Sequence, residues 1–201
     1  LYPATSLWQS RVALKHADHV FCVAEDHKVY LESWLRLPSP RVTRIFPGAA
    51  PAFASAGVDR DYRRFGSIVF AGTWIERKGI REVVETFERL AGRHPDWTLT
   101  VLGGGKAEDE IKAAFQSKNR SRVRCLATRN DRETASVLAE GDVFLLPSVS
   151  EGTPLTLIEA MAAGLPVVTT AVCGMKDVVR QGQSGILVGV HDVGGMVSAI
   201  E

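Results

Sequence analysis

Residues 142–170, DVFLLPSVSEGTPLTLIEAMAAGLPVVTT, contain two short apolar runs and a helical segment between them. The helical segment is expected to begin around Leu155 or Thr156 and to end at Gly164, because glycine is favoured just past the end of a helix. The second apolar run follows Pro166. Because both runs are continuously apolar rather than alternating, they predict strands of a parallel sheet that is buried on both faces.

The same alternation extends over most of the chain. The other apolar runs are SIVFAG (67–72), TLTVLG (98–103), VRCLA (123–127) and GILVG (185–189). Between the runs, residues 79–94 have the apolar stripe of an amphipathic helix, and in residues 131–141 we expect Asp131 to cap a helix and Gly141 to end it. Six apolar runs separated by helical segments predict an α/β fold with a doubly wound, parallel, six-stranded Rossmann-like sheet.

The amino-terminal part of the chain has a different composition. Its pattern predicts a helix, a strand and a helix, followed by a Pro-, Ala- and Gly-rich segment at 37–57. This change predicts a domain boundary near Pro47–Gly57, with residues 1–46 ending one domain and residues 47–201 forming another. Because the chain begins at Leu1 and stops within a helical pattern, we expect it to be a piece of a longer protein.

The composition excludes several classes of protein. With 45% hydrophobic and 23% charged residues and a net charge of +1, the chain is expected to fold, and its overall charge does not favour a nucleic-acid or membrane partner. Three cysteines without a CxxC motif indicate neither a zinc ribbon nor a redox pair, and they fit a reducing compartment. We therefore predict a cytoplasmic protein that binds no nucleic acid, with peripheral attachment to the cytoplasmic membrane face left open.

Polar and glycine-rich segments follow the predicted strands, where the ligands of open α/β sheets bind. The free N–H groups near Leu155 favour an anion, and Glu159, one turn into the helix, is expected to reach the same cleft as Glu151. Arg77 and Lys78, after an earlier strand, supply positive charge for a diphosphate. An anion between two carboxylates, each of which accepts hydrogen bonds from hydroxyls, predicts a nucleotide sugar as the ligand.

These segments resemble a known family. Residues 150–170 resemble the Glu-x7-Glu signature of retaining glycosyltransferases of the GT-B fold, family 4, the glycogen-synthase-like and mannosyltransferase-like group. FAGTWIERKGI (70–80) resembles the phosphate loop of that family, and ADHVFCVAEDHKVYL (17–31) resembles the end of its amino-terminal domain. The resemblance spans nearly the whole chain. It implies that residues 47–201 form the domain that binds the nucleotide sugar and that residues 1–46 end the acceptor domain.

The resemblance also implies a role for each matched residue. Glu151, which would bind hydroxyls of the donor sugar, and Lys78, which would bind the diphosphate, are the implied catalytic residues. Glu159 would bind the ribose. The other implied donor-binding residues lie in the phosphate loop, at the helix start, in the second strand's loop and beside the base: Arg77, Gly72, Thr73, Leu155, Thr156, Gly104, Thr128 and Arg129.

The implied activity is the transfer of a hexose from a UDP- or GDP-sugar to a glycan, lipid or small-molecule acceptor, with retention and without a metal or cofactor. Since the rest of the acceptor domain would lie outside this chain, the chain alone is expected to be inactive. Two departures from the family are Thr73, where an arginine is usual, and FPGAA (46–50), where the hinge usually has Asn-Gly. A non-catalytic nucleotide-binding module and a GT-B epimerase are the alternatives.

Overall fold

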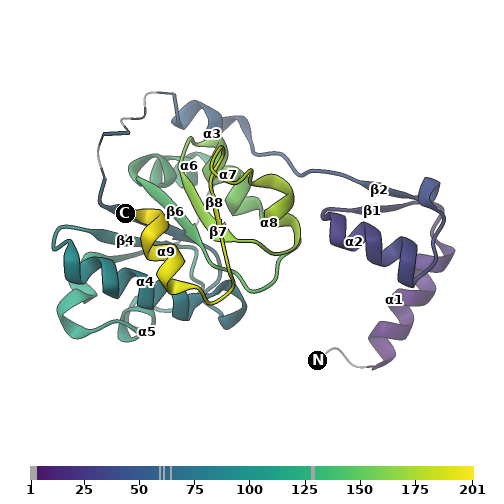
Figure 1. Cartoon of the computed structure of the whole chain (residues 1–201), viewed down its shortest axis with the longest axis horizontal. Helices are drawn as coiled ribbons and strands as arrows, with labels where there is room; N and C mark the ends of the chain where they lie inside the picture. The colour runs from purple at the N-terminus through teal and green to yellow at the C-terminus, as the bar shows by residue number, and fades with distance from the viewer. Residues whose placement is uncertain (1–3, 59, 61, 64, 128–129) are drawn as a thin grey trace. The chain divides into compact units, whose positions relative to one another are not determined.

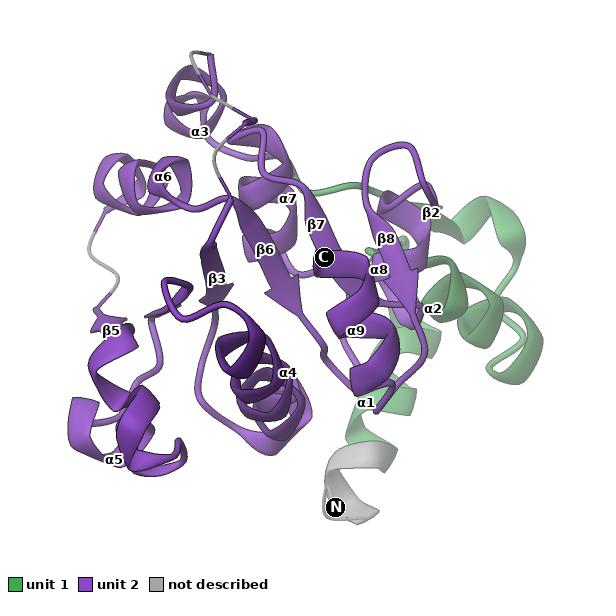
Figure 2. Ribbon diagram, turned by 60° about the vertical axis from the view of Figure 1, so that its left-hand side comes forward, with its two compact units in different colours: residues 1–47 green, residues 48–201 purple. Residues whose placement is uncertain are grey.

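The structure of the chain is a computed structural model that describes residues 4–58, 60, 62–63, 65–127 and 130–201 (Figure 1). The chain divides into two compact units, Leu1–Pro47 and Gly48–Glu201 (Figure 2). Each unit has its own cluster of buried apolar side chains.

The first unit is small. Its elements are the helix α1 (Ala4–His16), the strand β1 (Val20–Cys22), the helix α2 (Glu25–Val29), the π-helical turn η1 (Tyr30–Trp34), the 3-10 turn η2 (Ser39–Arg41) and the strand β2 (Val42–Arg44). The strands β1 and β2 pair in parallel, and Leu31, Leu35 and Val42 are buried beside them. The sequence predicts the helix–strand–helix order, but β2, which is three residues long, was not predicted.

The second unit contains one six-stranded sheet. Its strands are β3 (Ser67–Ala71), β4 (Thr98–Leu102), β5 (Val123–Leu126), β6 (Val143–Leu146), β7 (Val167–Thr170) and β8 (Ile186–Val188). All of the pairings are parallel, and the order across the sheet is β5-β4-β3-β6-β7-β8. The predicted six-stranded, doubly wound α/β sheet is therefore confirmed.

Helices cover both faces of this sheet (Figures 1 and 2). They are α3 (Pro51–Ala56), α4 (Ile80–Arg93), α5 (Glu108–Ala113), α6 (Asp131–Glu140), α7 (Leu155–Ala162), α8 (Cys173–Val178) and α9 (Val193–Ile200), with the 3-10 turns η3 (Glu76–Lys78) and η4 (Ser117–Arg122). The helix α4 packs against α9 on one face, and α3 packs against α6 and α7 on the other. Because both faces are covered, the central strands are buried on both sides, and this explains their continuous apolar runs.

Two local expectations are corrected by the structure. The cap of α6 is Asn130 rather than Asp131: Asn130 has an extended backbone, and its side chain accepts a hydrogen bond of 2.9 Å from the Glu133 N–H. Asp131 is the first residue inside the helix. The helix α3 lies within the Pro-, Ala- and Gly-rich segment where the sequence predicts a boundary, and Pro51 occupies its first turn, where proline costs no hydrogen bond.

Candidate functional site

The centre of the sheet is a topological switch point. The strands β3 and β6 are neighbours there, but the chain runs from β3 to β4 on one side and from β6 to β7 on the other. The connections that leave their carboxyl ends therefore diverge and open a crevice, which is the usual ligand site of this fold class. The two loops meet in a backbone hydrogen bond of 2.9 Å from the Val149 N–H to the Arg77 carbonyl oxygen.

A cluster of charged side chains joins these two loops. Lys78 Nζ lies 2.7 Å from Glu151 Oε1, and Arg77 Nη1 lies 3.0 Å from the same oxygen. Arg77 also donates a hydrogen bond of 2.7 Å to the Ser150 carbonyl, and the Ser148 hydroxyl donates one of 3.3 Å to Glu151. The side chains of Lys78 and Glu151 are only 13% and 10% exposed. The predicted catalytic residues are thus in direct contact in a partly dry setting.

The backbone of the first loop depends on Gly79. Its φ of +74° lies in the left-handed region, and a Cβ at this position would stand 2.0 Å from the Pro147 carbonyl oxygen. Only glycine allows both this conformation and this close approach of the second loop. Gly79 thereby ends the η3 turn, begins α4 and places Lys78 against Glu151.

A pocket of about 320 Å³ lies at the same end of the sheet. Its lining comes from α3, the loops after β3 and β4, and the amino ends of α6 and α7: Phe53, Ala71, Gly72, Thr73, Leu102, Gly103, Asn130, Asp131, Thr134, Thr156 and Glu159. The volume is in the range of pockets that hold small ligands. The structure thus brings together the predicted residues Gly72, Thr73, Thr156 and Glu159.

Two polar groups of α7 mark this pocket as a place for a polar ligand. Burial raises the pKa of the Glu159 carboxyl, and the charge of Asp131 raises it further. The Thr156 hydroxyl is buried and, among the described residues, has no hydrogen-bond partner. Since an unsatisfied buried hydroxyl costs free energy, it is available to a ligand in the pocket.

The other predicted residues lie outside this pocket. Among the described residues, Glu151, Lys78, Arg77 and Leu155 do not line it, although a Cβ on the lining residue Gly72 would stand only 3.7 Å from Lys78 Nζ. The charged cluster therefore adjoins the pocket at Gly72. That Glu151 and Glu159 share one cleft stays a prediction, because only Glu159 lies in the pocket.

Gly104 has a different environment. Its carbonyl accepts a hydrogen bond of 2.8 Å from the Trp74 N–H, and a Cβ on it would meet Ile111 at 2.6 Å. Gly104 lines a separate hollow next to α5, whereas Gly103 lines the pocket with Glu159. Thr128 and Arg129, which were predicted to lie beside a base, are outside the described residues.

Sequence reasoning missed several pocket residues. Asn130 and Asp131 could have been found, because Asn130 and Glu133 have the Asn-x-x-Glu spacing of a helix start, and helix starts at the carboxyl edge of a sheet face the ligand. Thr134 follows one turn later. Phe53 carries no motif, because it reaches the pocket from α3, a helix that precedes the sheet.

The described residues contain neither a candidate metal site nor a helix that could span a membrane. In the part of the chain that the structure describes, no three or more His, Cys, Asp or Glu side chains are grouped so that they could hold a metal ion. None of the described helices combines the length and the apolar character that crossing a bilayer would require.

The doubly wound parallel sheet, with a charged cluster and a pocket at its switch point, places the chain in the class of open α/β folds to which the GT-B glycosyltransferases belong. The model of one family, glycosyl transferases group 1, matches residues 66–201. The chain belongs to that family.

Two curated relatives carry glycosyltransferase names. The chain is 30% identical over 179 residues to the D-inositol 3-phosphate glycosyltransferase of Corynebacterium kroppenstedtii, a match covering 82% of this chain. It is 32% identical over 152 residues to the phosphatidyl-myo-inositol mannosyltransferase of Mycolicibacterium smegmatis, a match covering 74% of this chain. The chain spans 39% of the length of each of these relatives. Such names do not favour the binding-module or epimerase alternatives.

Solved structures show the same fold. Sucrose-phosphate synthase from Thermosynechococcus elongatus is similar with a TM-score of 0.79 and 24% identity, over 98% of this chain and 52% of that one. HepE of Anabaena, in complex with UDP and glucose, is similar with a TM-score of 0.74 and 17% identity, over 99% of this chain and 57% of that one. At these identities the likeness concerns the fold alone.

Proposed function

We propose that this chain is the donor-binding part of a retaining glycosyltransferase that transfers a hexose from a nucleotide-diphosphate sugar without a metal ion. The observation that carries the proposal is the contact of Lys78 and Arg77 with Glu151 at the switch point, next to the pocket that contains Glu159. The cations and the helix start suit the diphosphate of such a donor. The two carboxylates suit the hydroxyl groups of its ribose and of its sugar.

The diphosphate is assigned to the cations and to the start of α7. In the proposal, Lys78 and Arg77 offset its charge, and the first backbone N–H groups of α7, at Leu155 and Thr156, donate hydrogen bonds to it. In the proposed reaction these groups stabilise the leaving diphosphate while the sugar develops oxocarbenium character. Thr73, which lines the pocket, supplies no charge, so this role falls on Lys78 and Arg77.

The two carboxylates are assigned to the two hydroxyl-bearing ends of the donor. Glu159 accepts hydrogen bonds from the ribose, and Glu151 accepts them from the transferred sugar. Glu151 is held by both cations. We infer that the diphosphate draws Lys78 and Arg77 partly away from Glu151 and so frees its oxygens for the sugar.

The division of labour within the whole protein is part of the proposal. Residues 1–46 would end an acceptor domain and residues 47–201 would bind the donor. Acceptor recognition, whether of a glycan, a lipid or a small molecule, would then rest mainly on residues outside this chain. The chain alone should therefore bind nucleoside diphosphates and show little or no transfer.

Calorimetric titration of the chain with UDP, GDP and ADP, each in the presence of EDTA, tests the proposal. We expect saturable binding of at least one of the three, competition by the corresponding nucleotide sugar, and no change when the chelator is replaced by magnesium. Absence of binding by all three diphosphates, or binding that requires the metal, would contradict it.

A further inference from the structure

Arg60, in the segment between α3 and β3, holds the carboxyl ends of two helices together. Its guanidinium donates hydrogen bonds to the carbonyls of Leu138 and Gly141, at the end of α6. It also donates two, of 3.2 and 3.1 Å, to the Ala163 carbonyl at the end of α7. One planar side chain therefore binds three carbonyls at two helix ends, where carbonyls lack helical partners; of the three, the Leu138 carbonyl also accepts the Gly141 N–H.

The same two helices carry the pocket at their other ends. Asn130 and Asp131 line it from the start of α6, and Thr156 and Glu159 line it from α7. The helices have 10 and 8 residues, and each is only two to three turns long, so that a tilt of one end also displaces the other end. A change in the distance between the carboxyl ends of α6 and α7 would therefore alter the angle between the two helix axes. It would also alter the spacing of the pocket residues that the helices carry.

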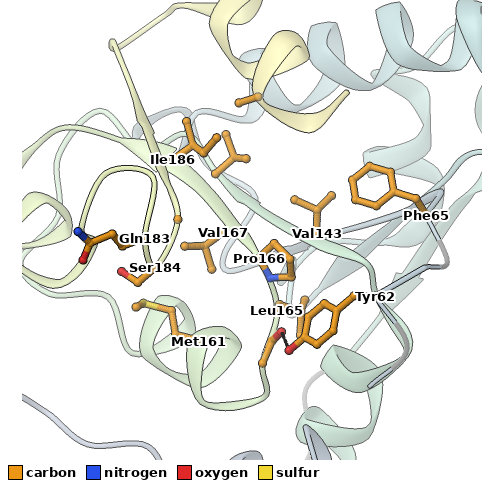
Figure 3. A pocket seen from close by; sticks show the side chains of 14 residues that line it. Tyr62, Phe65, Val143, Met161, Leu165, Pro166, Val167, Gln183, Ser184 and Ile186 are labelled. Atoms are coloured by element: carbon orange, nitrogen blue, oxygen red, sulfur yellow. Dashed lines mark hydrogen bonds between the residues drawn. The ribbon is translucent and has the colours of Figure 1, made fainter. Parts of the chain in front are cut away.

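Gly57 and Tyr62, which flank Arg60 in the sequence, both lie close to the carboxyl end of α7. A Cβ on Gly57 would stand 2.6 Å from the Ala163 carbonyl oxygen. Tyr62 donates a hydrogen bond of 3.1 Å to the Gly164 carbonyl, at the edge of a hollow of about 450 Å³ (Figure 3). This hollow lies at the amino ends of β6, β7 and β8, on the opposite edge of the sheet from the candidate site. Arg60 does not line the pocket, so any effect on the pocket has to pass through the two helices that Arg60 joins.

We propose that Arg60 is a positioning residue for nucleoside recognition: by tying the end of α6 to the end of α7, it sets the separation of Asp131 from Glu159 in the pocket. This inference rests on the proposed function, since it concerns the same ligand. It adds a residue that touches no part of the donor and lies at the far edge of the sheet.

The position of the cations gives the inference a specific consequence. Lys78 and Arg77 belong to the loop after β3 and are held by Glu151 and Ser150, in the loop that leads from β6 into α7, so the groups assigned to the diphosphate lie on the α7 side of the pocket. The loss of Arg60 should therefore weaken the binding of inorganic pyrophosphate less than the binding of a nucleoside diphosphate, because the ribose and base of the latter are proposed to extend toward α6. A general loss of stability would weaken the binding of both ligands in the same proportion.

The experiment compares Arg60→Met, Arg60→Lys and Tyr62→Phe in the 201-residue chain by calorimetry, at a temperature where thermal unfolding shows each variant to be folded. The ligands are pyrophosphate and the nucleoside diphosphate that the wild type binds best. Tyr62→Phe is the matched control, because it removes a hydrogen bond to α7 only and leaves the tie to α6 intact. Arg60→Lys retains the charge but has one nitrogen, which cannot span both helix ends.

For both Arg60 variants we expect the Kd of the nucleoside diphosphate to rise roughly 3- to 30-fold, and that of pyrophosphate by less than about twofold, with Tyr62→Phe like the wild type. Equal weakening of both ligands, wild-type affinity in Arg60→Met, or full affinity in Arg60→Lys would each overturn the inference. If the wild-type chain binds pyrophosphate but no nucleoside diphosphate, the proposed function fails first, and that result is distinct from a failure of the Arg60 tie.

Discussion

Lys78 Nζ lies 2.7 Å from Glu151 Oε1, and this contact joins the loops that follow the two central strands of the sheet. The two residues are 73 positions apart in the sequence, and so are their neighbours Arg77 and Ser150, whose hydrogen bond spans the same two loops. A pair so far apart in sequence depends on the pairing of β3 with β6. The charged cluster therefore forms only because β3 and β6 are neighbours in the sheet. Its contribution to the free energy of unfolding can be measured.

Lys78→Met should lower both stability and ligand affinity. It leaves the Glu151 carboxylate, 10% exposed, with Arg77 as its remaining cationic partner, so we expect the free energy of unfolding to fall by about 1–3 kcal/mol. Loss of one charged contact should weaken nucleoside diphosphate binding by about tenfold or more. Urea unfolding and calorimetry measure the two effects. Arg81→Met is the control, because the Arg81–Glu76 pair is 79% and 66% exposed and should contribute at most about 1 kcal/mol.

Glu159→Gln should change the pH dependence of stability. Because burial raises the pKa of Glu159, the native state holds this proton more tightly than the unfolded chain does. The wild type therefore loses stability as pH rises from the ordinary glutamate value, about 4.3, to the raised value, and the loss persists at higher pH. The variant should match the wild type below this interval and be more stable above it.

Glu159→Gln should also change the affinity for a nucleoside diphosphate. At neutral pH the same Glu159→Gln substitution should weaken nucleoside diphosphate binding, because the amide accepts fewer hydrogen bonds from the ribose. Thermal unfolding at several pH values and calorimetry at neutral pH measure the two effects. Glu85→Gln, in an exposed pair with Arg89 on α4, should show neither. A strong loss of stability in Glu159→Gln at neutral pH would indicate a structural role instead.

Gly79→Ala and Gly92→Ala should have opposite effects. A methyl group at Gly79 meets the Pro147 carbonyl at 2.0 Å and requires the left-handed backbone region, so we expect a loss of more than about 2 kcal/mol and displacement of Lys78. Gly92 lies near the end of α4, where an added Cβ would meet nothing within 4 Å, and alanine there should stabilise by about 0.5–1 kcal/mol. Urea unfolding compares them, and a neutral Gly79→Ala would contradict the account of the loop.

His191→Ala should weaken the attachment of α9 to α4. The His191 ring Nδ1 is hydrogen-bonded to Glu82 in the first turn of α4, and the Glu82 side chain is only 11% exposed. Removal of the ring deprives a mostly buried carboxylate of this partner, which should cost about 1–3 kcal/mol. Arg124→Ala, in a pair with Glu140 that is 58% exposed on both sides, serves as the control and should cost less than about 1 kcal/mol in urea unfolding.

Part of the site was within reach of sequence reasoning. The start of α7 at Leu155 follows from Pro154 and the apolar pattern, and the contact of Lys78 with the Glu151 loop follows once both are placed at the carboxyl edge. The capping role of Asn130 was missed in favour of Asp131. Both residues can cap a helix, and only the backbone angles and the Glu133 hydrogen bond distinguish between them.

The sequence by itself determined the sheet, because runs such as VFLL at 143–146 are apolar at every position and are stable only when helices cover both faces. It also predicted that the loops with Gly79, Lys78 and Glu151 follow strands at the carboxyl edge of the sheet. The tertiary structure alone decided that Phe53 and Glu159 share a pocket and that Arg60 ties α6 to α7. These contacts join residues that are far apart in the chain, and their formation depends on the packing of α3 against α6 and α7, which no local pattern encodes.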